Sequence, residues 1–178
     1  MTESEMVEGL LRKDPAAIRE MISANGDRLL RSAFLLCENE SDAQDLVQET
    51  LVESVRSIHR FRRESALYTW LHGILVNMNR GLYRKQKKMK FTYRFPTKDI
   101  TIDSKEEFLN LGQDSSVLAQ LVQHLSPFYR EVVILRFYEG MKVEEIARHL
   151  GLPVNTVKTR LRRAVEWLKD FLKKTETF

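Results

Sequence analysis

The side chains best suited to bind a ligand in this 178-residue chain are cationic and polar, and they recur between Asn155 and Arg163. Arg and Lys can contact guanine edges or phosphates, while Asn and Thr can reach bases or the DNA backbone. At helical spacing these residues lie outside an inward apolar stripe that begins at Val157 and Leu161. The alternative is the solvated basic face of an ordinary core helix. The expected DNA contacts are Asn155, Thr156, Lys158, Thr159, Arg160, Arg162 and Arg163.

A helix-turn-helix is the element that would present these side chains. Residues 143–150 have the spacing of a first helix, in which Ala147 is small enough for two helices to cross closely. Gly151 can adopt the left-handed conformation that ends a helix, and Pro153 fits the first position of the next helix. The pattern is typical of proteins that read a DNA groove, although many regulators share it.

A second polar surface is expected on a helix over residues 41–58. Ser41 and Gln44 form a capping box that would open this helix. Its inward stripe is Ala43, Leu46, Val47, Leu51, Val55 and Ile58. A neighbouring strip of polar side chains with one valine suits docking against a basic partner, and the alternative is a plain solvent face. This strip consists of Asp45, Gln48, Glu49, Val52 and Arg56.

Residues 61–67 and a helix over residues 65–88 form a basic segment with interleaved aromatic side chains. Aromatic rings stack on unpaired bases, amides reach base edges and cations contact phosphates, so this composition suits single-stranded nucleic acid. The core side of the helix is expected to hold Leu67, Trp70, Leu71, Ile74, Met78 and Leu82, with His72 on the other side. The candidate contacts are Phe61, Arg62, Arg63, Ser65, Tyr68, Asn77, Arg80 and Arg84.

The remaining periodicities predict an all-α protein of two small helical domains joined by a flexible linker. Helices are expected over residues 3–12 and 15–37 in the first domain, where Asp14 and Pro15 are a start signal. Residues 89–115 lose the helical pattern, and helices resume over 117–125 and 126–138. The expected division is a first domain over 1–88, a linker over 89–115 and a second domain over 116–178.

Charge is segregated along the chain. Residues 61–94 hold nine Lys or Arg side chains against one Glu, and residues 152–178 hold seven against three, whereas residues 1–60 and 95–151 are net acidic. Two basic segments that far apart predict two polyanion-binding surfaces. A small repressor with a single helix-turn-helix would need only the second.

Several classes of function are disfavoured by the composition. Cys37 is the single cysteine and lies in an apolar run, and His72 stands alone, so we expect no disulfide, no metal site, no cofactor and no catalytic set. No apolar run has the length of a membrane span, and the acidic start lacks the features of a secretion signal. We therefore expect a cytoplasmic protein without membrane insertion that is not an enzyme.

Three stretches together resemble bacterial sigma factors of the sigma-70 family, most closely the extracytoplasmic-function (ECF) subgroup. The first is the run from Asp42 to Thr50, and the second is Tyr68-Thr69-Trp70-Leu71 with Asn77. The third is residues 125–163, which begin Leu-Ser-Pro-Phe-Tyr-Arg-Glu. The resemblance covers nearly the whole chain apart from the expected linker.

The resemblance implies a role for each surface. The first domain would be sigma region 2, in which the strip of Asp45, Gln48 and Glu49 grips the beta-prime clamp of core RNA polymerase. Residues 61–84 would capture flipped non-template bases of the minus-ten element, and the second domain, sigma region 4, would read the minus-thirty-five element. The resemblance also implies contact with the polymerase beta flap, duplex promoter DNA and an anti-sigma factor. Arg162 departs from the aromatic or His of some relatives, so its base preference does not carry over.

Two other classes of protein remain open at this point. A free-standing helix-turn-helix regulator would bind duplex DNA without polymerase, but it would leave the Asp45 strip unexplained. A helical adaptor or a nucleic-acid-processing enzyme would use the basic segments only to hold its substrate. No phosphate-binding loop, nucleophile set or metal-ligand spacing supports that enzyme.

Overall fold

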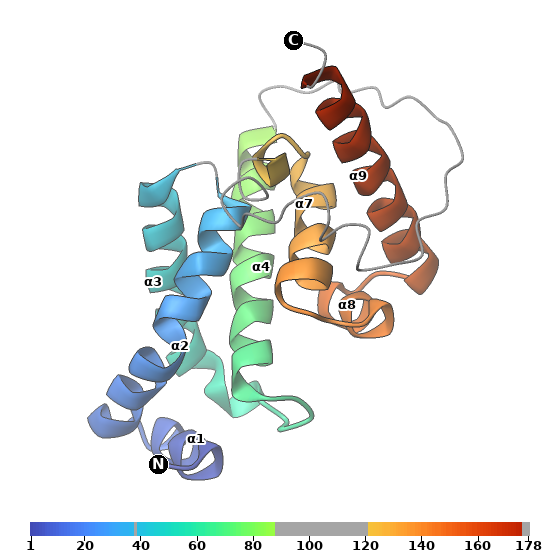
Figure 1. Cartoon of the computed structure of the whole chain (residues 1–178). Coiled ribbons are helices and arrows are strands. Elements are labelled where there is room, and N and C mark those ends of the chain that lie inside the picture. Colours follow the sequence, from blue (N-terminus) through green and yellow to red (C-terminus); the bar gives the residue numbers. More distant parts are fainter. Residues whose placement is uncertain (38, 88–120, 176–178) are drawn as a thin grey trace. The chain divides into compact units, whose positions relative to one another are not determined.

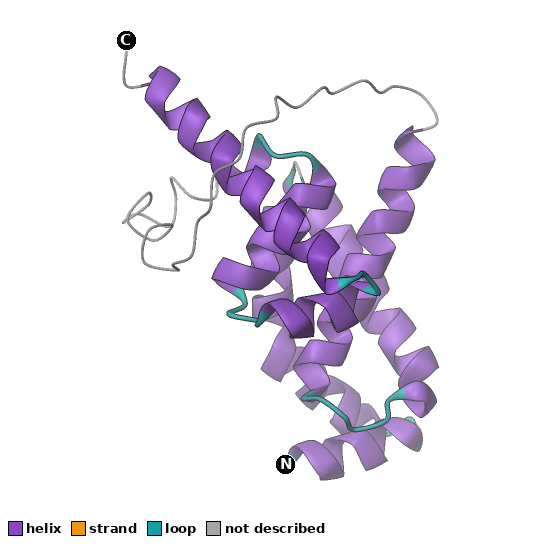
Figure 2. Cartoon of the chain, turned by 90° about the vertical axis from the view of Figure 1, so that its right-hand side faces the viewer, coloured by secondary structure: helices purple, strands orange, loops and turns teal. Residues whose placement is uncertain are grey.

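The computed structural model describes residues 1–37, 39–87 and 121–175, and every element in these ranges is helical (Figures 1 and 2). The all-α prediction is confirmed. Two compact units divide the chain, Met1–Leu82 and Tyr83–Phe178. The expected linker over 89–115 and residues 117–120 of the expected helix over 117–125 lie outside the described residues, and the domain boundaries at 88 and 116 stay predictions. Among the described helices, none combines the length and apolarity that crossing a membrane requires.

The first two helices of unit 1 cross at a glycine. Helix α1 spans Glu3–Leu11 and α2 spans Pro15–Leu36, close to the expected bounds. The Asp14 carboxylate accepts a hydrogen bond from the Ala16 amide at 2.9 Å, which confirms the predicted start of α2. Where α1 meets α2, a Cβ on Gly9 would lie 2.5 Å from Cβ of Ala17. The crossing therefore needs glycine at this position, because any side chain would push the helices apart.

Helix α3 (Glu40–Ser57) is capped two residues before the predicted cap, Ser41. The cap is Asn39, whose side-chain oxygen accepts from the Asp42 amide at 2.8 Å. Gln44 instead donates to the Glu40 carboxylate within the helix. The prediction of a Ser41–Gln44 box is wrong because Asn39 is an equally good cap and lies earlier in the chain. A short 3-10 helix, η1 (Ile58–Arg60), follows.

The inner side of α3 is narrower than predicted. Ala43, Leu46 and Val47 are buried as expected, but Leu51 and Val55 are only half-buried. Small hydroxyl residues occupy the inner positions further along the helix, and their side chains donate to carbonyls of the same helix. Thr50 Oγ1 donates to the Leu46 carbonyl and Ser54 Oγ to the Leu51 carbonyl, both at 2.7 Å. The same hydroxyls also lie at hydrogen-bonding distance from methionine sulfurs on other helices, Thr50 from Met78 Sδ at 3.8 Å and Ser54 from Met21 Sδ at 3.6 Å.

Helix α4 (Leu67–Lys87) is rotated about its axis relative to the prediction. Leu67 and Leu71 are buried as expected, but Trp70, Ile74 and Met78 are half-buried and Leu82 is exposed. The prediction that Tyr68 and His72 lie on the outer side is wrong. The observed buried stripe, which includes Tyr68 and His72, is shifted by one residue along the sequence from the predicted stripe. Both stripes have helical spacing, so the sequence alone does not distinguish them. The buried face is Leu67, Tyr68, Leu71, His72, Leu75 and Val76.

His72 is a buried polar group with a partner on another helix. Its Nε2 lies 2.7 Å from Oγ of Ser32 on α2, at hydrogen-bonding distance. The Arg28 guanidinium covers the neighbouring Tyr68 ring, with Cζ 3.7 Å from the ring centroid. Burial, assisted by the positive charge of Arg28, lowers the pKa of His72 from 6.5 to about 4. The imidazole is therefore neutral in the folded protein at neutral pH.

The stability of unit 1 should fall as the pH drops below 6.5. The pKa of His72 is lower in the folded than in the unfolded chain, so the unfolded chain binds the extra proton first. The loss should be at most roughly 1.4 kcal/mol per pH unit down to the folded pKa. Urea unfolding at pH 7, 6 and 5 measures this loss of stability. His72→Gln should flatten the dependence of the unfolding free energy on pH, whereas His59→Gln, at an exposed position, should leave it unchanged. An unaltered slope in His72→Gln would refute this account.

Unit 2 contains the predicted helix-turn-helix. Helix α8 spans Val143–Leu150 and α9 spans Val154–Thr175, and Gly151 between them has a φ of 61°. The left-handed turn is thus confirmed. Pro153 lies just before the helix, and its carbonyl accepts from the Val157 amide, so α9 begins one residue later than expected. Helix α7 (Pro127–Val133) continues into a π-helical turn, η2 (Ile134–Tyr138), which the sequence did not reveal.

The inner faces of α7, α8 and α9 share one apolar core. Ile146, Leu150 and Val157 are buried as the helix-turn-helix pattern requires. The rest of the predicted α9 stripe holds, since Ala164, Val165 and Leu168 are buried and Leu161 is half-buried. This packing fixes which side of α9 faces outward.

Candidate functional site

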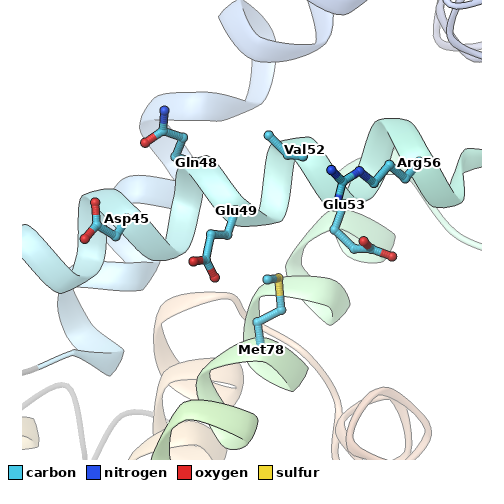
Figure 3. Close-up of a pocket in the computed structure, with 7 residues that line it drawn as sticks. All are labelled: Asp45, Gln48, Glu49, Val52, Glu53, Arg56 and Met78. Carbon is cyan, nitrogen blue, oxygen red and sulfur yellow. The ribbon is translucent and has the colours of Figure 1, made fainter.

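The predicted strip on α3 forms a continuous outer surface of unit 1. All five of its residues are exposed, including Val52, of which 47% is accessible. They line a shallow groove of about 630 Å³ to which α4 contributes Met78, whose side chain reaches toward α3 (Figure 3). We call the following set the α3 strip: Asp45, Gln48, Glu49, Val52, Glu53, Arg56 and Met78.

Two members of the α3 strip were missed from the sequence. Glu53 lies four residues after Glu49, so helical spacing could have found it. Met78 was assigned to the core, and only the rotation of α4 reveals that its side chain borders the groove. With three carboxylates, one guanidinium and two apolar side chains, the α3 strip suits a basic partner that also offers an apolar contact.

The segment before α4 combines a partly covered aromatic pair with exposed polar side chains. The Phe61 ring lies 5.4 Å from the Trp70 ring, centroid to centroid, and both residues are half-buried. Arg62 and Ser65 are exposed. The two rings are tilted by 45°, and aromatic rings with a cationic neighbour are the groups that bind unpaired bases.

Arg63 differs from its neighbours because helix α1 holds it. Its guanidinium donates to Ser4 Oγ at 3.1 Å and lies 4.0 Å from the Glu8 carboxylate. Its backbone has a φ of 59°, which is uncommon for a residue with a side chain. Arg63 is exposed nonetheless, so a phosphate could reach it in exchange for Glu8.

The candidate contacts on α4 do not all share one face. Asn77 is exposed and Arg80 is half-buried, on the outer side as expected. Tyr68, in contrast, is 9% exposed and lies under Arg28, because it belongs to the inner stripe. We therefore correct its assignment from an exposed candidate to a core residue. The side chain of Arg84 lies outside the described residues.

The outer face of α9 presents the predicted polar side chains together. Asn155 and Lys158 are exposed, and Thr156, Thr159, Arg162 and Arg163 are half-buried. A groove of about 350 Å³ runs along this face, and α7 contributes Tyr129 to its wall. Tyr129 was missed because its place depends on how α7 packs against α9, which no local pattern encodes. The α9 groove is lined by Tyr129, Asn155, Thr156, Thr159, Arg160 and Arg163.

Two arginines of α9 are engaged by carboxylates. Arg160 lies 3.0 Å from Glu131 of α7, a side chain that is 3% exposed, and its guanidinium is 5.2 Å from the centroid of the Phe128 ring. Arg162 lies 3.3 Å from Glu166, one turn further along α9. The sequence predicted Arg160 as a DNA contact on the flank of the outward face; the structure shows it in the groove wall with a buried partner, Glu131, and its contact with DNA stays a prediction.

No group of three His, Cys, Asp or Glu side chains in the described ranges is arranged to hold a metal ion. Cys37 is buried at the end of α2. The described surfaces of α3 and α9 offer charged and hydrogen-bonding side chains.

Comparison with known proteins gives the same two-part organisation. The family model for sigma-70 region 2 matches residues 21–89, and the model for sigma-70 region 4 matches residues 115–168. RNA polymerase sigma factor SigV of Bacillus subtilis is 34% identical over 150 residues, covering 82% of this chain and 85% of that protein. ECF RNA polymerase sigma factor SigE of Mycolicibacterium smegmatis is 30% identical over 161 residues, covering 87% of this chain and 61% of that protein.

A solved structure agrees in fold over most of the chain. The sigma factor RpoE of Bartonella quintana, crystallised with the anti-sigma factor NepR, matches with a TM-score of 0.66 and 25% identity, covering 87% of this chain and 96% of that one. The two family models match in the order that the sequence resemblance predicted, and the similarity to SigV extends over most of both proteins. This chain belongs to the sigma-70 family of RNA polymerase sigma factors, in the extracytoplasmic-function subgroup.

Proposed function

We propose that this sigma factor docks on core RNA polymerase through the α3 strip and reads a promoter with two separate surfaces. The α9 face would contact the minus-thirty-five element as duplex. Phe61, Arg62, Ser65, Asn77 and Arg80 would contact unpaired non-template bases of the minus-ten element. The observation that carries this proposal is the pairing of opposite chemistries on the two units: an outward acidic strip on α3 and an outward polar, cationic groove on α9.

Docking on polymerase would supply the specificity that neither DNA surface has alone. Phosphate contacts are blind to sequence and weaken with salt, so a single small basic surface discriminates poorly. With both units held on one polymerase, through the beta-prime clamp and the beta flap, the second DNA contact becomes effectively intramolecular. The chemistry of RNA synthesis then belongs to polymerase, and this chain is not itself an enzyme.

We also propose an anti-sigma factor as a regulatory partner. The Bartonella quintana relative was solved in complex with one. The α3 strip and the α9 groove are exposed in the described structure, so a protein that covers either surface would block the proposed contacts. Binding to polymerase and promoter DNA implies a cytoplasmic location.

Selection of promoters from a random DNA library tests the proposed function. Core polymerase reconstituted with the full chain should enrich two sequence elements at a fixed separation and initiate transcription downstream of them. Core polymerase alone should enrich neither element. Enrichment of a duplex site by the chain alone, together with no binding to core polymerase, would instead identify a free-standing regulator.

Arg162→Ala is expected to weaken recognition of the upstream element by roughly 1 to 3 kcal/mol and to relax the base preference at one position. The reason is that Arg162 lies on the outward face of α9, where its ion pair with Glu166 orients the guanidinium. Equilibrium binding of holoenzyme to a panel of single-base promoter variants measures the effect. Arg19→Ala, an exposed arginine of α2, removes the same charge and should leave binding unchanged. An equal loss on every sequence would show that Arg162 contacts phosphate only.

A further inference from the structure

A buried carboxylate lies behind the DNA-facing side of α9. Glu131 is 2% exposed, in the middle of α7, and its Oε1 accepts a hydrogen bond from Nη1 of Arg160 at 3.0 Å. The Arg160 side chain is 23% exposed, and Phe128 flanks its guanidinium at 5.2 Å. Arg160 is thus held from two sides by α7.

The position of this ion pair connects it to recognition. Arg160 forms part of the wall of the α9 groove, beside Asn155, Thr159 and Arg163. Its charge is compensated by Glu131 inside the unit, whereas Lys158 on the same helix is exposed. Breaking a buried ion pair by removing one partner is costly, so the arginine will not exchange Glu131 for a phosphate without a large penalty. Arg160 therefore shapes the groove while adding little positive charge for DNA.

We infer that Glu131 is a positioning residue for promoter recognition: it holds Arg160 away from DNA phosphates and fixes the wall of the α9 groove. The inference rests on the proposed function, since it assigns a role within the surface that would read the upstream element. Its physical logic is that a cation free to reach phosphates raises affinity for every sequence alike. Restraining that cation leaves discrimination to side chains that contact base edges.

Glu131→Gln tests the inference because glutamine keeps the size and a hydrogen-bond acceptor but removes the charge. With its partner neutral, Arg160 can turn outward, since its side chain is already partly exposed. In reconstituted holoenzyme, the logarithm of the duplex binding constant should fall more steeply with the logarithm of the salt concentration. We expect the slope to increase in magnitude by about 0.9, the value for one added phosphate contact. Affinity for non-promoter duplex should rise several-fold, and the ratio of promoter to non-promoter affinity should fall.

Two further variants separate this role from a general effect of charge or stability. Combining Glu131→Gln with Arg160→Met removes the released cation, so the salt dependence should return to the wild-type slope. Asp170→Asn makes the same charge change at an exposed position of α9 and should leave the promoter preference unchanged. Thermal unfolding of each full-length variant checks that unit 2 remains folded.

The outcomes distinguish the inference from the function on which it rests. A wild-type holoenzyme without promoter preference would overturn both. A wild-type preference that Glu131→Gln leaves unchanged, in slope and in ratio, would overturn the inference alone. The inference would also fall if Glu131→Gln lost affinity equally on all sequences at an unchanged slope, because that pattern indicates a purely structural residue. The inference is supported if the salt dependence becomes steeper in Glu131→Gln and returns to the wild-type slope when Arg160→Met is added.

Discussion

Charge reversal of Asp45 and Glu49 to lysine is expected to abolish binding to core RNA polymerase while leaving the fold intact. Both residues are exposed, one helical turn apart on the α3 strip, and neither has a hydrogen bond within unit 1 among the described contacts. Placing two cations opposite a basic partner replaces attraction by repulsion. The cost should be several kcal/mol, or at least roughly a hundredfold in affinity. Titration of labelled full-length protein with core polymerase measures it.

A matched variant keeps this experiment specific. Glu20→Lys with Asp27→Lys makes the same charge change on α2, where both residues are also exposed. This control should bind polymerase with nearly wild-type affinity at moderate salt. Similar losses in both double variants would mean that polymerase senses only the overall charge of the protein. Unchanged affinity in the α3 variant would refute docking through the α3 strip.

Arg160→Ala should destabilise unit 2 by roughly 3 to 5 kcal/mol, since it removes the cationic member of an ion pair whose carboxylate, Glu131, is buried. The Glu131 side chain is 3% exposed, so water can replace the guanidinium only if the packing around α7 opens. Unfolding can be followed through the two tryptophans, Trp70 in unit 1 and Trp167 in unit 2. In a Trp70→Phe background, the fluorescence of Trp167 reports unit 2 alone, which avoids fitting two units to one transition.

Two companion variants interpret the Arg160 result. Replacing Glu131 by leucine and Arg160 by methionine together should recover most of the lost stability, because neither charge then remains buried alone. Arg162→Ala breaks the more exposed pair with Glu166 and should cost less than about 1 kcal/mol. If Arg160→Ala also lowers the unfolding free energy by less than about 1 kcal/mol, water readily hydrates the Glu131 carboxylate. The ion pair is then not a fixed part of the groove.

The features that the sequence predicted correctly are those encoded by neighbouring residues. Asp14 followed by Pro15 starts a helix through local hydrogen bonding and a fixed φ, whatever else packs nearby. Gly151 ends α8 because glycine adopts the left-handed conformation at little cost. The members of the α3 strip that lie on α3 itself follow from helical spacing, so they were available without any knowledge of tertiary structure, whereas Met78 of α4 was not.

The errors occurred where a choice between two local solutions depends on distant contacts. Two stripes on α4 have the same period, and Ser32 on α2 selects the one that contains His72 by offering it a hydrogen bond. For Arg160, predicted on the flank of the outward face, the sequence did not reveal that Glu131, twenty-nine positions earlier, is its ion-pair partner. Tyr129 joins the α9 groove through the same packing of α7. No local pattern identifies such partners, because they are neighbours only in the folded chain.

The attachment of Arg63 to helix α1 makes any DNA contact by this residue an exchange reaction. Before a phosphate can be bound, the contacts with Ser4 and Glu8 must be given up, so the binding free energy from Arg63 is the difference between two similar contacts. That difference is small, and the vacated Glu8 carboxylate would repel a nearby phosphate. Arg63 would consequently add little to how tightly the downstream element is held. Changes to Ser4 or Glu8 of α1 would alter that contribution without touching DNA.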